Sequence, residues 1–192
     1  MFLQTTPIVE PFDHDDPRLI AQSEGLLDRA FGIGRRTKTS YRFREGESAV
    51  PGLSYGLWLP ASDAPDGSGE RLLVAIISYW HLRIGSDGHE AIMLGPLAVE
   101  PVLQGKGLGR MLMDHTLQLA GDLGHKLVIL VGDEPYYAAS GFSRVPAGRL
   151  LLPGPVDPAR LLYRELQPGS LAPVSGLVLP PKRFAEVHGN QV

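Results

Sequence analysis

Three segments in the first half of the chain have the hydrophobic pattern of β-strands. Residues 54–59 alternate weakly between apolar and polar, residues 71–80 form a nearly continuous apolar run typical of burial on both faces, and residues 91–99 are again mostly apolar. Turn-forming residues separate these segments, at positions 60–69 and 85–88. The pattern therefore predicts an antiparallel meander of three strands.

Two longer segments have the period of amphipathic helices. The first follows Asp16 and Pro17, which suit a helix cap and the first helical position, and Gly32 ends it. The second, residues 107–123, has a predicted apolar stripe of Leu108, Met111, Leu112, His115, Leu119 and Leu123. On that stripe, His115 is more readily explained as a hydrogen-bonded core residue than as a functional one.

Residues 126–131 form the next predicted strand. A strand, a helix and a strand in this order predict a parallel crossover, which is right-handed by rule. Pro96 lies inside the preceding strand, where proline cannot donate to the strand ladder. Gly95 and Pro96 therefore predict a bulge or a local separation of strands. An edge strand that tolerates the proline is the alternative.

After Phe142 the chain becomes rich in proline and glycine. Short apolar runs remain at residues 150–152, 161–166 and 177–179, and they predict edge strands and loops. We expect residues 1–145 to form the core of one domain and residues 146–192 to complete that same domain. A homodimer contact made by the C-terminal elements is an alternative.

The composition excludes several classes of function. The chain has 192 residues, 43% of them hydrophobic and 20% charged, as in ordinary soluble globular proteins. Its net charge of −3 offers no general attraction to nucleic acid or to an acidic membrane. The lack of cysteine excludes disulfides, thiolate zinc sites and a cysteine acyl-enzyme. The sequence shows neither a signal peptide nor an apolar run of about 20 residues, so we expect a cytoplasmic location and no membrane partner.

Metal and nucleic-acid sites have no support in the pattern of side chains. The six histidines lack ligand spacing such as H-E-x-x-H, and no basic stripe is interleaved with aromatic residues. We therefore expect neither a metal ion nor nucleic acid. A basic cluster follows the first helix at Arg35, Arg36 and Lys38. A solvated face is its simpler interpretation, and contact with a substrate or a phosphate is the alternative.

Residues 94–112 combine a strand, a glycine-rich loop and the start of a helix. Backbone N–H groups in such a loop can hold a phosphate, and Arg110 adds a positive charge. The spacing fits neither a dinucleotide-binding loop, which would need glycine at position 110, nor a P-loop. It does fit Q-x-x-G-x-G at Gln104, Gly107 and Gly109. The loop thus resembles the Q/R-x-x-G-x-G/A signature of the GNAT superfamily of acyl-CoA N-acyltransferases, with an ordinary glycine-rich turn as the alternative.

Residues 135–142 supply a second resemblance. Their sequence, PYYAASGF, is similar to the superfamily's aromatic-Tyr-x-x-x-Gly-Phe motif and lies one strand beyond the glycine loop. The longer run 95–142 is similar to a bacterial subgroup of predicted N-acetyltransferases with a VGDEPYYAASGF-type motif. Residues 26–32 and 151–155 also resemble that subgroup, so the resemblance covers most of the chain.

The resemblance implies a fold and a cosubstrate. The fold is α+β, with a mixed, mostly antiparallel twisted sheet, flanking helices and a splayed central strand pair. The cosubstrate is acetyl-CoA, whose pantetheine arm would bond the backbone of Leu97, Ala98 and Val99. Its pyrophosphate would be held by the loop formed by Gln104, Gly105, Lys106, Gly107, Leu108, Gly109 and Arg110.

Acyl transfer from a thioester to an amine also needs proton donors. Tyr137 occupies the tyrosine position of the motif, and its phenol, protonated at neutral pH, would donate to the leaving thiolate. A role in packing only is the alternative for Tyr137. The backbone N–H of Leu97 or a neighbour would stabilise the carbonyl oxygen. Some relatives carry a glutamate within the strand at 91–99, but this chain does not. The open candidates for the general base are Glu90, His89, His81 and water.

The sequence thus predicts an N-acetyltransferase that acts on a primary amine by direct attack in a ternary complex. A non-catalytic acyl-CoA-binding sensor or regulatory module is the second hypothesis, and a nucleotide-binding domain of another fold is the third. The acceptor would be a small-molecule or peptide amine, and no motif in the sequence identifies it.

Overall fold

The computed structural model describes residues 7–37, 39–60 and 71–189. Its strands are β1 (Ile8–Pro11), β2 (Tyr55–Leu59), β3 (Leu72–Ile84), β4 (His89–Val99), β5 (Leu127–Val131), β6 (Ser143–Arg144), β7 (Leu150–Leu151), β8 (Leu161–Glu165) and β9 (Gly176–Leu179). Its α-helices are α1 (Pro17–Phe31), α2 (Thr39–Arg42), α3 (Leu108–Asp122), α4 (Glu134–Tyr137) and α5 (Pro181–His188). Short 3₁₀ turns are η1 (Ile33–Thr37), η3 (Pro101–Leu103), η4 (Ala138–Ser140) and η5 (Pro158–Arg160). Most of the predicted turn at 60–69 lies outside the described residues, and so does Lys38.

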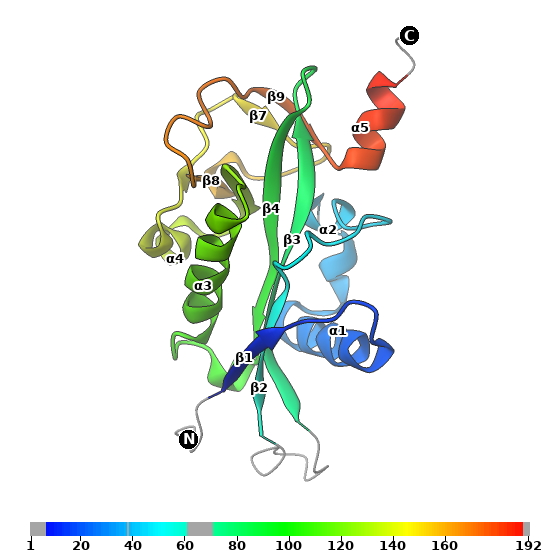
Figure 1. Cartoon of the computed structure of the whole chain (residues 1–192), viewed down its shortest axis with the longest axis vertical. Coiled ribbons are helices and arrows are strands. Elements are labelled where there is room, and N and C mark those ends of the chain that lie inside the picture. The colour runs from blue at the N-terminus through cyan, green and yellow to red at the C-terminus, as the bar shows by residue number, and fades with distance from the viewer. Residues whose placement is uncertain (1–6, 38, 61–70, 190–192) are drawn as a thin grey trace.

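The strands form a mixed sheet in the order β1-β2-β3-β4-β5-β8-β6 (Figure 1). Neighbours along this order are antiparallel, except that β4 and β5 run parallel and are connected through α3. The predicted meander is therefore confirmed as β2-β3-β4, and the predicted parallel crossover as β4-α3-β5. The fold is the predicted α+β arrangement with flanking helices.

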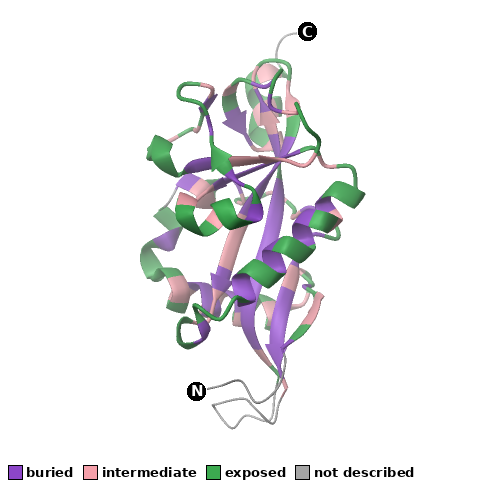
Figure 2. Cartoon of the chain, turned by 90° about the vertical axis from the view of Figure 1, so that its left-hand side faces the viewer, coloured by how far each residue is buried: buried purple, intermediate pink, exposed green. Residues whose placement is uncertain are grey.

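Helices α1 and α3 cover opposite faces of the sheet (Figure 1). Leu26 and Leu27 of α1 pack with Leu73 and Ile76 of β3 in one cluster. The buried side chains of α3 belong to a second cluster, which includes other residues of β3 and β4. Buried residues accordingly concentrate on the strands, and exposed residues on the outer sides of the helices (Figure 2).

The first predicted helix has the predicted ends. The Asp16 side chain accepts a hydrogen bond from the backbone N–H of Arg18, and Pro17 is the first helical residue. At the other end, the Gly32 N–H donates to the Asp28 carbonyl, and Gly32 has a φ of 80°. Such a conformation suits glycine and ends the helix.

The predicted stripe of α3 is wrong in its phase. The buried residues are Leu108, Gly109, Leu112, Met113, Thr116, Leu117 and Ala120. His115 is exposed, as are Met111 at 39% and Leu123 at 56%. The buried face of α3 is hard to recognise in the sequence because it includes a polar residue, Thr116. This side chain is buried and hydrogen-bonds to the Leu112 carbonyl and to the Tyr79 hydroxyl. His115 is therefore not a core residue.

The C-terminal segment differs in part from the prediction. Strand β8 is not an edge strand, because it pairs with β5 on one side and with β6 on the other. Strand β9 pairs with the far end of β3 and with β7. Helix α5, helix α2 and strand β1 were not predicted from the sequence. Within the described ranges, no helix is long and apolar enough to cross a membrane.

Candidate active site

The central strands β4 and β5 separate after two paired residues. Ile92 pairs with Val128 and Met93 with Ile129, and no further pair follows between these strands. Residues 97–99 remain paired with β3, while the end of β5 pairs with β8. The edge of β4 that faces β5 is thus left open beyond Met93. This arrangement confirms the splayed strand pair that the resemblance implied.

A bulge lies where β4 leaves β5. Leu94 is opposite Tyr79 and Leu97 is opposite Ile77, so Gly95 and Pro96 together face the single residue Ser78. The indole N–H of Trp80 donates to the Gly95 carbonyl at 2.6 Å. The bulge predicted from Pro96 is confirmed, and β4 is a central strand rather than an edge strand.

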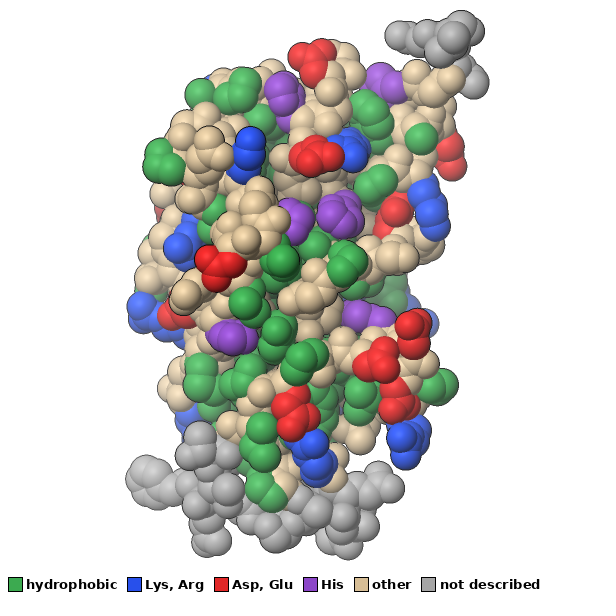
Figure 3. All heavy atoms as spheres, in the orientation of Figure 1, with side chains coloured by type: hydrophobic (Ala, Val, Ile, Leu, Met, Phe, Trp, Pro, Cys, Tyr) green, Lys and Arg blue, Asp and Glu red, His purple; other side chains and the backbone are tan. Residues whose placement is uncertain are grey.

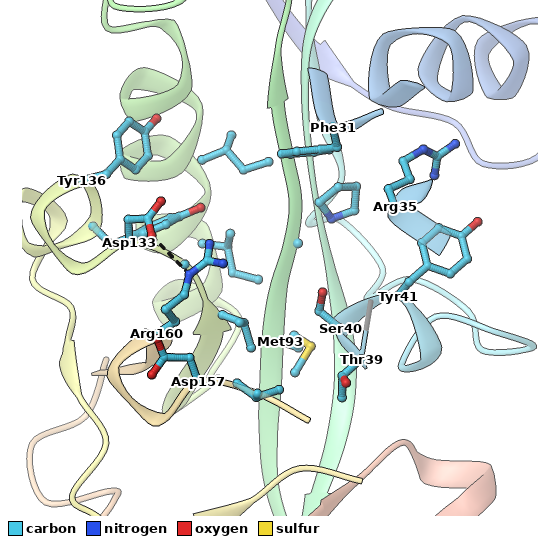
Figure 4. A pocket seen from close by; sticks show the side chains of 18 of the residues that line it. Phe31, Arg35, Thr39, Ser40, Tyr41, Met93, Asp133, Tyr136, Asp157 and Arg160 are labelled. Atoms are coloured by element: carbon cyan, nitrogen blue, oxygen red, sulfur yellow. Dashed lines mark ion pairs between the residues drawn. The ribbon is translucent and has the colours of Figure 1, made fainter. Parts of the chain in front are cut away.

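A cleft of about 590 Å³ opens at this separation (Figure 4). Residues 93–97 of β4 line it between two walls. One wall is formed by the end of α1, by η1 and by α2, and the other by α4 with residues 155–157 and Arg160. The two walls touch where the Thr39 hydroxyl donates to the Pro155 carbonyl at 3.0 Å. A volume of this size is typical of small-molecule sites.

The glycine loop precedes α3 beside the open edge of β4. Gly105 has a φ of 76° and Gly107, the N-cap residue of α3, has a φ of 81°. Both values lie in the region that favours glycine. A Cβ added at Gly109 would meet the Tyr136 hydroxyl at 2.5 Å and Val99 Cγ2 at 3.2 Å. Glycine is therefore required at positions 105 and 107 by the backbone conformation, and at position 109 by close packing.

Polar side chains hold the glycine loop against its neighbours. The Gln104 amide donates to the Val99 carbonyl at 3.1 Å, which ties the loop to β4. Arg110 donates to the Ala139 carbonyl at 3.0 Å and lies 3.5 Å from the Asp114 carboxylate. The Leu108 side chain is buried in the core. The first N–H groups of α3, which have no acceptor within a helix, remain the anion-binding feature of this segment.

Tyr137 lines the cleft and is held by close contacts. A Cβ at Gly132 would lie 2.2 Å from the Tyr137 ring, so the ring rests directly on the backbone of Gly132. Phe142 and Tyr136 contact the same ring edge-on. Burial raises the pKa of Tyr137 above its ordinary value, and Tyr136 and Asp133 raise it further. Within the described residues its hydroxyl makes no hydrogen bond, so it is a protonated donor available to a ligand.

The candidates for the general base lie elsewhere. His81, His89 and Glu90 line a second cavity together with His125, and none of them lines the cleft. This cavity lies toward the β3-β4 turn, and histidine side chains are visible in the upper half of Figure 3. Glu90 is also paired with Arg83, which holds the pKa of that carboxyl below its usual value. The structure therefore does not bring these three residues to the cleft.

The cleft contains carboxylates that the sequence did not single out for chemistry. Asp133 is at the N-cap position of α4, but its side chain makes no cap bond and instead pairs with Arg160 at 3.1 Å (Figure 4). Asp157 accepts a hydrogen bond from the Ala159 N–H at 2.9 Å. No motif marks Asp157, and only the path of the chain around η5 brings it to the cleft.

The basic cluster after α1 is not uniformly a solvated face. Arg35 is only 3% exposed and pairs with Glu24 and Asp28, whereas Arg36 is exposed and pairs with Glu24. Arg35 lines the cleft together with Tyr41 and Arg44, two residues that sequence reasoning missed. No group of three or more metal-ligating side chains occurs among residues 7–37, 39–60 and 71–189.

A bidentate ion pair connects α1 to the segment before the glycine loop. Arg29 Nε lies 3.1 and 3.0 Å from the two carboxylate oxygens of Glu100, and Arg29 Nη2 lies 2.9 Å from one of them. Glu100 is the residue between β4 and η3, and its side chain is 15% exposed. This contact joins one wall of the cleft to the chain that leads into the loop.

Comparisons with known proteins agree with this geometry. A model of the acetyltransferase (GNAT) domain matches residues 68–144, which include the glycine loop and Tyr137. The uncharacterized N-acetyltransferase YhbS of Escherichia coli K12 is 24% identical over 155 residues, which are 81% of this chain and 86% of that protein.

Solved structures share the fold. The crystal structure of YhbS from E. coli in complex with CoA superposes with a TM-score of 0.71 and 21% identity, over 93% of this chain and 92% of that one. A GNAT family acetyltransferase from Brucella melitensis in complex with acetyl-CoA gives a TM-score of 0.53 and 20% identity, over 81% and 94%. Together these similarities show that the chain has the fold of the GNAT N-acetyltransferases and that its residues 68–144 match the acetyltransferase (GNAT) domain.

Proposed function

We propose that this protein transfers the acetyl group of acetyl-CoA to a primary amine bound in the cleft, by direct attack in a ternary complex. The observation that carries the proposal is the separation of β4 from β5, because the open edge of β4 faces the same cleft that Tyr137 lines. The match of residues 68–144 to the acetyltransferase (GNAT) domain supports acyl transfer, and the CoA and acetyl-CoA complexes of the two solved structures support the choice of cosubstrate.

The chain has the features needed to hold acetyl-CoA. The N–H groups of Gly105, Lys106, Gly107, Leu108, Gly109 and Arg110 would hold the pyrophosphate, with Gln104 fixing the loop. The backbone of Leu97, Ala98 and Val99 would bond the pantetheine arm along the open strand edge. Support comes from the positive φ of Gly105 and Gly107 and from their open surroundings, since no atom lies within 4 Å of the place where a Cβ would be at either position.

The proposed chemistry needs two donors from the protein. The thioester supplies the acyl group: the amine nitrogen bonds to the carbonyl carbon as the C–S bond breaks and the sulfur leaves with its electron pair. A backbone N–H at the bulge, from Leu97 or a neighbour, would stabilise the charge that develops on the carbonyl oxygen. The Tyr137 hydroxyl would protonate the sulfur and recover a proton from solvent, while the attacking amine releases its own proton.

Calorimetric titration of CoA and acetyl-CoA into the purified chain tests the proposal. We expect micromolar binding, and we expect Gly107→Glu to abolish it by placing a negative charge in the anion loop. Gly148→Glu is the matched control, because Gly148 has a similar φ of 73° and equally open surroundings. Each variant therefore has a similar backbone strain, but only the first affects the loop.

Two results would contradict the proposal. A well-folded chain that binds neither compound is not an acetyltransferase of this kind, and equal loss of binding in the two variants would remove the glycine loop from the site.

The second candidate function, a non-catalytic acyl-CoA sensor, is favoured by one observation: residues 93–97, which line the cleft, include no carboxylate. Such a sensor would bind acetyl-CoA without turnover.

A further inference from the structure

The wall of the cleft formed by η1 and α2 carries an unusual pair of arginines. Arg35 and Arg44 both line the cleft, and their guanidinium carbons lie 5.5 and 4.1 Å from the centre of the Tyr41 ring. Figure 4 shows Arg35 and Tyr41 on the wall opposite Asp133 and Arg160. The ring and the two cations thus form one group, named the arginine wall below.

The charges of the arginine wall are only partly balanced. Buried Arg35 is neutralised by Glu24 and Asp28, and its Nη1 atom has no hydrogen-bond partner within residues 7–37, 39–60 and 71–189. Arg44 is partly buried and makes no ion pair within the described residues. Burial, and then the positive charge of Arg35, lower the pKa of Arg44. A guanidinium that is partly removed from water without a counter-ion is a binding site for an oxyanion.

The opposite wall has the complementary feature. Arg160 is neutralised by Asp133, so these two charges cancel. Asp157 accepts one backbone hydrogen bond and makes no ion pair in the described part of the chain. Among the described residues, the charged side chains that line the cleft therefore leave one unpaired cation, Arg44, and one unpaired anion, Asp157.

We infer that the acyl acceptor is a zwitterionic amine, whose oxyanion group binds Arg44 beside Tyr41 while its amine binds Asp157. This inference rests on the proposed function and specifies its substrate class. The oxyanion is a carboxylate, as in an amino acid, or a phosphate, as in a phosphorylated amino alcohol. The Thr39–Pro155 contact holds the two walls together, so one small molecule can reach both charges.

The same arrangement gives the acceptor amine a route to its reactive form. Only a neutral amine can attack, so the bound ammonium must lose a proton before the C–N bond forms. The Asp157 carboxylate, which holds the ammonium, is the group placed to accept that proton. Asp157 thereby supplies the base that β4 lacks at residues 93–97.

The test is acetyl transfer from acetyl-CoA to a panel of matched amines. The panel contains amino acids, their carboxamides, the corresponding decarboxylated amines and phosphoethanolamine. We expect amino acids or phosphoethanolamine to be acetylated with kcat/KM at least tenfold above their counterparts that lack the oxyanion. Comparison of amino acids with phosphoethanolamine distinguishes a carboxylate site from a phosphate site.

Variants assign the preference to the arginine wall. Arg44→Gln is expected to reduce the preference for the acid over its amide by about 30-fold, as expected for loss of charge-assisted hydrogen bonds. Arg44→Lys, which keeps the charge but not the forked donor, should retain part of it. Arg42→Gln is the matched control, since Arg42 is an exposed residue of α2 that does not line the cleft.

The outcomes separate the inference from the proposed function. Two results overturn the inference and leave the cosubstrate assignment intact, provided that acetyl-CoA still binds. One is transfer only to amines that lack an oxyanion, and the other is that no acid in the panel is acetylated or bound. A preference for the acid that survives Arg44→Gln also overturns it. Loss of acetyl-CoA binding itself would instead refute the proposed function.

Discussion

Tyr137 is the residue on which the catalytic hypothesis depends, and Gly132 sets its position. Because the ring rests on the backbone of Gly132, even an alanine there would displace the ring. Tyr136 and Phe142 pack against the ring, and the hydroxyl, which borders the cleft, has no hydrogen-bond partner among the described residues. A buried phenol with a raised pKa is a proton donor over the whole physiological pH range.

Replacement of Tyr137 by Phe tests the donor role directly. We expect kcat to fall by about 100-fold, the usual lower range for loss of a general acid, while the Kd of acetyl-CoA is unchanged. Steady-state kinetics and calorimetry measure the two quantities, and Tyr163→Phe, at a tyrosine outside the cleft, is the control. An unchanged kcat would show that Tyr137 only packs the cleft. A chain that binds acetyl-CoA without turnover in either form would be a sensor.

The pKa shift of Tyr137 also has a consequence for stability. Its folded pKa is raised above that of an unfolded chain, which is about 10. Below about pH 10 the tyrosine is protonated in both the folded and the unfolded chain, so it does not make the free energy of unfolding depend on pH. Above about pH 10 the unfolded chain ionises first, and the free energy of unfolding falls.

Single residues differed in how far the sequence revealed them. Gly107 and Gly109 were identified because a backbone requirement leaves a fixed spacing in the sequence. Asp157 and Arg44 were missed because each is a common surface residue type, and only the tertiary path of the chain brings it to the cleft. Arg35 was identified as part of a cluster, but its burial depends on Glu24 and Asp28 of α1, which lie 11 and 7 residues earlier in the chain.

At the scale of the element, α3 illustrates both the strength and the weakness of periodicity. Its start, its end and its place between parallel strands were predicted, since caps and apolar spacing are local features. Its orientation was predicted incorrectly because Thr116 occupies a core position. Thr116 is tolerated at this buried position because its hydroxyl forms a hydrogen bond with the hydroxyl of Tyr79 on β3 at 2.8 Å. Tyr79 lies 37 residues away in the sequence. Strand β8 is a similar case, since its two neighbours in the sheet could not be read from its five residues.

The bond between α3 and β3 makes a prediction about stability. Thr116→Val leaves the Tyr79 hydroxyl buried without a partner, so the free energy of unfolding should fall by about 1–3 kcal/mol. Denaturant unfolding measures the change. The double variant with Tyr79→Phe removes both partners and should cost less than the sum of the two single changes. Additive losses would show that the hydroxyls do not interact.

At the scale of the whole molecule, the sheet separates the two parts of the site. The glycine loop leads into α3 on one face, and the arginine wall belongs with α1 and α2 on the other (Figure 1). The sequence predicted this architecture through the resemblance and the order of strands. It could not predict the shape of the cleft, because residues 155–157 meet Thr39 only in the folded chain.

Product inhibition tests the two-sided arrangement. If acetyl-CoA and the acceptor enter from opposite faces, CoA should compete with acetyl-CoA but not with the amine, and the acetylated amine should compete with the amine. Initial rates with each product as inhibitor measure this. Competition of CoA with both substrates would place the two in overlapping space.

The ion pair between Arg29 and Glu100 gives the two faces a thermodynamic connection. Through it, any ordering of the segment before the glycine loop by CoA also restrains α1, which forms part of the acceptor wall. Linkage then requires each substrate to tighten the other by the same factor. A partly exposed pair of this kind contributes at most about 1 kcal/mol. The cooperativity transmitted by this contact is therefore limited to about fivefold, so the two substrates should bind with modest mutual reinforcement rather than in an obligatory order.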